Sequence, residues 1–137
     1  MNVLVIGGTR FFGIHMVNKL IENGHQVTIA TRGNAVDKFI NSVDKIIFDR
    51  NNEDSIKKAF SGKKYDIVID KIAYCSNDVK KLLDVINCKK YILMSSTAVY
   101  EPKHIGTMED EFNPLIKKLK WCDRLDADYS EVKRQAE

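Results

Sequence analysis

The chain opens with a short apolar run that leads directly into a glycine-rich segment, Val3-Leu4-Val5-Ile6-Gly7-Gly8-Thr9-Arg10-Phe11-Phe12-Gly13. An apolar run of this length, rich in β-branched side chains and closed by glycines, is typical of a buried strand. After the last glycine the apolar residues recur at intervals of three and four, at Ile14, Val17, Leu20 and Ile21, which indicates one face of a helix. The glycines therefore occupy a strand-to-helix turn, where the free N–H groups of a helix N-terminus can bind a pyrophosphate.

The rest of the chain alternates between apolar runs and segments with helical spacing. We expect strands at residues 26–30, 45–48, 66–70 and 90–94, and helices at residues 13–23, 35–41, 51–60, 76–87 and 115–120. Asn23-Gly24 is a usual end signal for a helix, and Asn52 or Asp54 could cap the helix that follows the third strand. This alternation predicts an α/β protein with a doubly wound parallel sheet of strand order 3-2-1-4-5.

Length and composition indicate one domain, residues 1–137, of ordinary composition. The chain is 44% hydrophobic and 30% charged, and its net charge of +3 is too small to argue for nucleic acid. No apolar run approaches the roughly 20 residues of a membrane span, and no secretory signal is visible. The cysteines and histidines are widely spaced, at positions 75, 88 and 122 and at 15, 25 and 104. We therefore expect free thiols, no metal site and a cytoplasmic location.

The glycine spacing resembles a known phosphate-binding loop. Gly7 and Gly13 are six residues apart, as in the G-x-x-G-x-x-G loop of the extended short-chain dehydrogenase/reductase family, the sugar-nucleotide epimerases and dehydratases. Arg10 replaces the middle glycine, which resembles an atypical branch that includes chloroplast stem-loop-binding proteins and bacterial epimerase-like proteins. Its guanidinium could lie along the pyrophosphate or obstruct it. The resemblance implies a Rossmann-type NAD(P)-binding fold, with loop contacts to the cofactor from Gly7, Thr9, Arg10, Phe11, Phe12 and Gly13.

Further cofactor contacts are expected where the other strands end, because ligands of such sheets bind at the carboxyl ends of the strands. The resemblance and this geometry together point to Arg32, Asp49, Arg50, Ile72, Ala73 and Ser95, and the resemblance implies that Asp49 contacts the adenine. The second strand ends without the acid that favours NAD, and Arg32 could instead pair with a 2′-phosphate. We therefore expect NADP to be favoured over NAD, with a merely solvated Arg32 as the alternative.

Two further segments resemble the catalytic motifs of that family. Residues 95–100 resemble Ser-Ser-x-x-Val-Tyr, which implies that Ser96 hydrogen-bonds the substrate. Tyr129 and Lys133 form Tyr-x-x-x-Lys and share a helix face, so the ammonium could stabilise a phenolate. Such a phenolate takes a proton from an alcohol as hydride leaves for the nicotinamide, and the resemblance also implies that Lys133 holds the nicotinamide ribose. Without the resemblance, ordinary turn hydroxyls and a chance Tyr–Lys pair would explain both motifs.

The resemblance covers only the N-terminal part of the extended family, whose members continue with further strands and a C-terminal substrate domain. We expect a Rossmann domain that is truncated after its fifth strand and about two turns into the catalytic helix. Such a chain should self-associate through its open sheet edge and be inactive by itself. Two functions remain open. The first is the cofactor half of an epimerase/dehydratase-like oxidoreductase acting on a hydroxyl or carbonyl substrate such as a nucleotide sugar. The second is a non-catalytic dinucleotide-sensing or RNA-binding protein, of which RNA binding is not favoured.

Overall fold

The computed structural model describes residues 1–36, 38–100 and 104–137, apart from the side chain of Pro114. These residues form two compact units, one made of residues 1–72 and 81–94 and the other of residues 73–80 and 95–137. No helix among the described residues is long and apolar enough to cross a membrane. The two units are described in turn.

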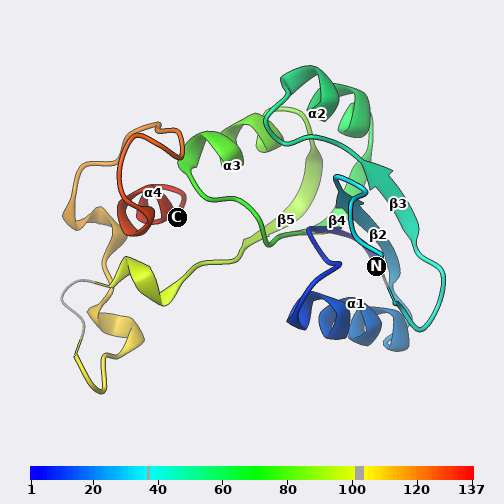
Figure 1. Ribbon diagram of the computed structural model, residues 1–137, viewed down its shortest axis with the longest axis horizontal. Coiled ribbons are helices and arrows are strands. Elements are labelled where there is room, and N and C mark those ends of the chain that lie inside the picture. The colour runs from blue at the N-terminus through cyan, green and yellow to red at the C-terminus, as the bar shows by residue number, and fades with distance from the viewer. Residues whose placement is uncertain (37, 101–103) are drawn as a thin grey trace. The chain divides into compact units, whose positions relative to one another are not determined.

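The first unit is built on a five-stranded parallel sheet, shown in blue to yellow-green in Figure 1. Its strands are β1 (Asn2–Ile6), β2 (Gln26–Thr31), β3 (Asp44–Ile47), β4 (Lys64–Asp70) and β5 (Asn87–Leu93). The spatial order is β3-β2-β1-β4-β5, which confirms the predicted topology. In the register of the central strand, Val5 lies between Ile29 of β2 and Ile69 of β4.

Helices cover both faces of this sheet, so the central strand is buried on each side. The helices of this unit are α1 (Phe12–Glu22), α2 (Glu53–Phe60) and the end of α3 (Ser76–Leu83), of which residues 81–83 belong to the unit. Helices α1 and α2 lie on opposite faces of the sheet in Figure 1. Val3 and Val5 pack on the α1 side with Val17, whereas Leu4 and Ile6 pack on the other side in a cluster that includes residues of α2. Successive side chains of a strand point to opposite faces, and both faces of β1 are buried. This explains why the sequence of β1 is a continuous apolar run.

The connection between β2 and β3 differs from the prediction, because the described residues of segment 35–41 contain no helix. Phe39 packs against the cluster on the α1 side of the sheet. The N–H of Ile40 donates to Oδ1 of Asn18, 3.0 Å away. A tertiary apolar contact and a side-chain hydrogen bond therefore hold this segment in an irregular conformation, and its helical spacing was misleading.

Two other predicted helices are shorter than expected. Helix α3 ends at Leu83 rather than at residue 87, since β5 already begins at Asn87 and pairs with the start of β4. The segment 115–120 has only a 3₁₀ turn, η3 (Pro114–Ile116). Beyond that turn, the side chain of Gln135 donates to the carbonyl of Lys118 at 3.1 Å and accepts from the N–H of Lys120 at 2.7 Å. These bonds use backbone groups that a helix would need.

The second unit is organised around α4 (Tyr129–Gln135) and the 3₁₀ turns η1 (Thr97–Val99) and η2 (Glu109–Glu111), in addition to η3. Its small core contains Cys75, Cys122 and Val132. The hydroxyl of Ser76 accepts from the N–H of Cys122 at 2.8 Å and ties the start of α3 to the segment before α4. All three cysteines of the chain are free thiols.

Candidate functional site

The turn after β1 requires glycine at two consecutive positions. Gly7 has a φ of +80°, and a Cβ placed on it would lie 2.5 Å from Cγ2 of Ile72. A Cβ on Gly8 would lie 2.9 Å from Val17 and 3.1 Å from Val5. The backbone of this turn therefore packs directly against the side chains of Ile72, Val17 and Val5 and leaves no room for a side chain of its own. The turn lies at the switch point of the sheet, where β1 is flanked by β2 and β4.

The N-terminus of α1 presents an electropositive end at this loop. The preceding residue, Phe11, has a φ of 53° and provides no side-chain cap, and the first turn of α1 carries no acidic residue. Arg10, Phe11 and Phe12 are exposed, whereas Thr9 is partly buried and Gly13 is buried. The N–H groups of Gly13 and Ile14 donate to the carbonyls of Arg10 and Phe11, at 3.1 and 3.3 Å. The helix dipole still favours an anion at this position.

The side chain of Lys71, which follows β4, reaches across the loop. Its ammonium lies 3.4 Å from the carbonyl oxygen of Gly7, 3.4 Å from that of Arg10 and 4.1 Å from the centre of the Phe12 ring. Sequence analysis noted no role for this lysine. The signal that could have found it is a lysine at the carboxyl end of a parallel strand, where ligands of such sheets bind.

The ends of β2 and β3 carry the residues predicted to contact the adenosine part of a cofactor. Arg32 and Asp49 are both exposed. The Asp49 carboxylate accepts from the N–H of Asn51 at 2.9 Å, and its own N–H donates to the hydroxyl of Ser55 at 2.9 Å. Asp49 is therefore held in a fixed turn at the carboxyl edge of the sheet.

Arg50, also expected at the cofactor, points into the protein. Its guanidinium forms an ion pair with Asp70, which is fully buried, and Arg50 itself is only 5% exposed. The same carboxylate accepts from the hydroxyl of Tyr91 at 2.9 Å and from the N–H of Ile72 at 3.0 Å. A buried pair of this kind needs such hydrogen bonds to offset its loss of hydration. The structure thus gives Arg50 a structural contact, at the end of β4, that the sequence pattern did not indicate.

In the second unit, the predicted serines lie at the start of η1. Ser96 caps this turn, and its hydroxyl accepts from the N–H of Ala98 at 3.2 Å. The hydroxyl of Ser95 donates to the carboxylate of Glu137. Within this unit η1 and α4 pack against each other, so Ser96 and the Tyr-x-x-x-Lys helix belong to the same compact region.

Helix α4 carries Tyr129 and Lys133 as predicted. Asp128 caps the helix by accepting from the N–H of Glu131 at 2.9 Å. Lys133 is only 3% exposed, and its ammonium donates to the carbonyl oxygen of Ala73 at 2.7 Å. Tyr129, one turn earlier, is 47% exposed. The lysine is thus fixed in the interior while the phenol faces solvent.

A second tyrosine adjoins Tyr129. The rings of Tyr74 and Tyr129 are 5.8 Å apart in an edge-to-face arrangement. The Arg124 guanidinium lies 4.5 Å from the Tyr74 ring centre and donates to Asp78 at 3.0 Å, and Asp78 also accepts from the N–H of Tyr74 at 2.8 Å. This chain of contacts orients Tyr74, a residue to which the sequence analysis assigns no role.

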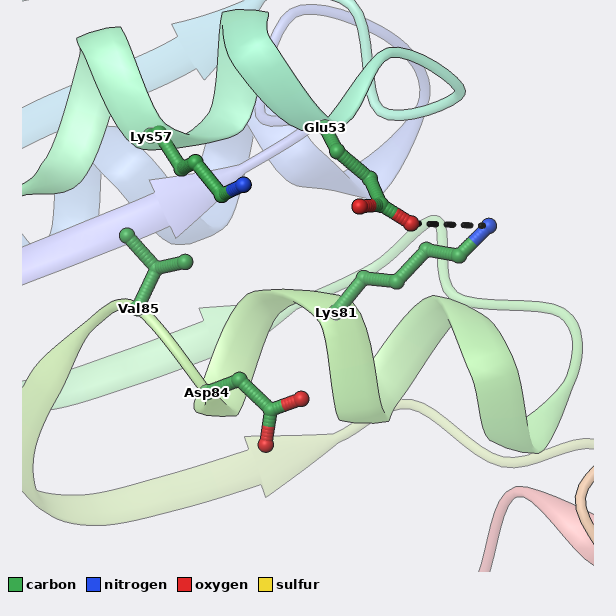
Figure 2. Close-up of a pocket in the computed structure, with 5 residues that line it drawn as sticks. All are labelled: Glu53, Lys57, Lys81, Asp84 and Val85. Carbon is green, nitrogen blue, oxygen red and sulfur yellow. Dashed lines mark ion pairs between the residues drawn. The ribbon is translucent and has the colours of Figure 1, made fainter.

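A depression in the first unit differs in character from the glycine loop. It is lined by Glu53, Lys57, Lys81, Asp84 and Val85 of α2, α3 and the turn after α3 (Figure 2). Glu53 and Lys81 form an ion pair at 4.0 Å. The acidic and basic side chains balance, and none of them was predicted to bind a ligand. We assign no site there.

A comparison with protein families finds one family model that matches almost the whole chain. The sequence model described as "NAD dependent epimerase/dehydratase family" matches residues 3–134. The match includes the glycine loop, the carboxyl ends of all five strands, and both Tyr129 and Lys133.

Individual relatives and solved structures agree with this match. The chain is 31% identical to "Chloroplast stem-loop binding protein of 41 kDa b, chloroplastic" of Arabidopsis thaliana, with 87% of the chain and 39% of the relative covered. It is 30% identical to "UDP-glucose 4-epimerase 3" of Oryza sativa subsp. japonica, with 80% and 38% covered.

Among solved structures, a UDP-galactose 4-epimerase has a TM-score of 0.69 at 20% identity, covering 99% of this chain and 49% of that one. A UDP-glucose 4-epimerase of Thermotoga maritima, solved with UDP-glucose, has a TM-score of 0.58 at 26% identity, covering 77% and 41%. The chain spans about two fifths of the length of the curated relatives it matches.

Proposed function

Because the chain belongs to the NAD-dependent epimerase/dehydratase family, we propose that it binds a nicotinamide dinucleotide at the glycine loop. We further propose that it forms the cofactor half of an epimerase- or dehydratase-like enzyme acting on a hydroxyl or carbonyl group of a nucleotide sugar. The observation that carries the proposal is the turn after β1, where Gly7 at φ +80° and the tightly packed Gly8 bring the loop against the uncapped N-terminus of α1. This cradle fits a diphosphate, since Gly7, Gly8 and Gly13 place no Cβ atoms in it and the dipole of α1 favours an anion there.

Residues of the first unit are assigned to hold the dinucleotide. The backbone of residues 7–13 would bind the diphosphate, and Asp49 would hydrogen-bond the adenine. Arg32, exposed at the end of β2, would pair with a 2′-phosphate and favour NADP over NAD. When bound, the nicotinamide supplies the hydride acceptor of an alcohol oxidation.

Residues of the second unit are assigned to handle the proton. The Tyr129 phenol, which faces solvent, would take the proton of the substrate hydroxyl, and the Ser96 hydroxyl would orient that group. The fixed ammonium of Lys133, one turn along α4, would stabilise the phenolate. The edge-to-face contact with Tyr74 limits the rotation of the Tyr129 ring.

Cofactor binding and preference are tested together by calorimetric titration of the native chain with NADP⁺ and with NAD⁺. We expect saturable binding of both, tighter for NADP⁺. Arg32→Ala should weaken NADP⁺ binding by about tenfold or more, as expected for loss of a charge-assisted bond, and leave NAD⁺ binding unchanged. Lys63→Ala, an exposed cation elsewhere on the same unit, is the matched control. Equal affinities of the native chain for NADP⁺ and NAD⁺, unchanged in Arg32→Ala, would overturn the preference for NADP. Absence of binding of either dinucleotide by the folded native chain would overturn the proposed function.

A second candidate function is RNA binding without catalysis. It is favoured by the 31% identity to a stem-loop-binding protein and by the exposed Arg10 in the loop. A titration with a stem-loop RNA distinguishes it from the first. Affinity for RNA that falls steeply with salt, together with no affinity for either dinucleotide, would support this second function over the first.

A further inference from the structure

The ammonium of Lys71 lies at the turn between β1 and α1. It lies within 3.4 Å of two carbonyl oxygens, those of Gly7 and Arg10, and against the Phe12 ring. A Cβ on Gly13 would collide with it. The buried glycine therefore leaves space for the ammonium beside the first turn of α1.

Among the residues that the structure describes, this cation has no negatively charged partner, which a partly buried charge normally has. Both oxygens that accept from it belong to neutral peptide groups, and among the described residues no carboxylate forms an ion pair with Lys71. Burial alone lowers the pKa of the Lys71 ammonium from its usual range, because desolvation disfavours the charged form. The first turn of α1 adds no acidic group. An anion bound here would therefore gain from both the helix N-terminus and the ammonium.

We propose that Lys71 binds the diphosphate of the dinucleotide. Its ammonium would neutralise the negative charge of the diphosphate at the glycine loop, in which Arg10 replaces a glycine. This role rests on the proposed function, because it assigns a further residue to the same site. Two properties suit Lys71 to it. Its side chain extends from the end of β4, on the opposite side of the β1 turn from Arg32, and its weak bonds to carbonyls can be exchanged for stronger bonds to phosphate oxygens at little cost.

The test is calorimetric titration of NAD⁺ into the native chain and matched variants, at about 50 and 300 mM salt. Lys71→Met keeps the length and apolar stem of the side chain but removes the charge, and Lys71→Arg keeps the charge. Lys64→Met makes the same change at the other end of β4, where the lysine is exposed, and is the control. Circular dichroism checks folding, and Lys71→Gln replaces Lys71→Met if the latter does not fold.

We expect Lys71→Met to weaken NAD⁺ binding by about 10- to 100-fold, as for loss of a charge-assisted hydrogen bond, and to make binding less sensitive to salt. Lys71→Arg should bind within about threefold of the native chain, and Lys64→Met should bind like it. Native affinity in Lys71→Met would overturn the role of Lys71 and leave the proposed function intact. Weaker binding with unchanged salt sensitivity would also overturn it, since the lysine would then only hold the loop. Absence of NAD⁺ binding by the native chain would overturn both.

Discussion

Replacing Gly7 by alanine tests whether the turn after β1 has the close approach that the proposed site requires. The added methyl group meets two separate obstacles. The residue has a φ of +80°, and its Cβ would lie 2.5 Å from Cγ2 of Ile72, well inside van der Waals contact. The variant should therefore fold less stably and also lose the loop conformation that would bind a diphosphate.

The magnitude follows from those two obstacles. A non-glycine residue in the left-handed region costs about 1–2 kcal/mol, and overpacking against Ile72 costs about 1–3 kcal/mol more. Gly7→Ala should thus lower the free energy of unfolding by about 2–5 kcal/mol. Gly24→Ala is the matched control, because Gly24 has a φ of +75° but no atom within 4 Å of the added Cβ. It should show only the backbone part of the loss.

The assay is urea unfolding followed by circular dichroism, applied to a double-mutant cycle with Ile72→Ala. That change removes the colliding Cγ2 and leaves Cβ of Ile72 at 3.6 Å, an ordinary contact. We expect the double variant to lose about 1–3 kcal/mol less free energy of unfolding than the two single variants lose together. Equal losses for Gly7→Ala and Gly24→Ala, with no coupling to Ile72, would refute the inferred close approach.

Two further predictions concern ionic contacts. Asp70→Asn removes the carboxylate that pairs with the buried Arg50 and should lower the free energy of unfolding by about 3 kcal/mol. Asp66→Asn, the control at an exposed ion pair, should have a much smaller effect. Equal losses of the two variants in urea unfolding would contradict this prediction. The hydrogen bond from Arg134 lowers the pKa of Glu131 from 4.5 to about 2, so its stabilisation, about 1–2 kcal/mol after solvent screening, is present above pH 4.5 and is lost as the pH falls toward 2. Glu131→Gln should remove that pH dependence from the thermal unfolding midpoint, and an unchanged acid profile would show that the pair contributes nothing.

The parts of the fold that depend on local pattern could be predicted from the sequence. The run Val3–Ile6 is apolar on both faces because β1 is the central strand. Glycines follow it at positions 7 and 8 because the turn after β1 packs closely against neighbouring side chains. Asn52 caps α2, accepting from the N–H of Ser55 at 3.0 Å, as one of the two predicted candidates. The alternation of strands and helices extended this local reading to the strand order, which the structure confirms.

The features that depend on distant contacts could not be predicted. The sequence placed Arg50 at a strand end, and only the folded structure shows it paired with Asp70, twenty residues away. The segment 35–41 has helical spacing, yet Phe39 and the Asn18 side chain hold it in another conformation. Lys71 likewise gains its position through the loop opposite its strand. In each case the position is decided by a tertiary contact, and in segment 35–41 that contact overrides local propensity.

Hydrogen–deuterium exchange with and without NAD⁺ tests most directly where the dinucleotide binds. We predict that NAD⁺ slows amide exchange in residues 7–14, because a diphosphate bound at the loop would hold the loop and the first turn of α1 in one conformation and reduce their local opening. Exchange in α2, which carries no predicted site residue, should stay the same. Binding of NAD⁺ that leaves residues 7–14 unprotected, or no protection anywhere in the folded chain, would contradict a dinucleotide site at the glycine loop.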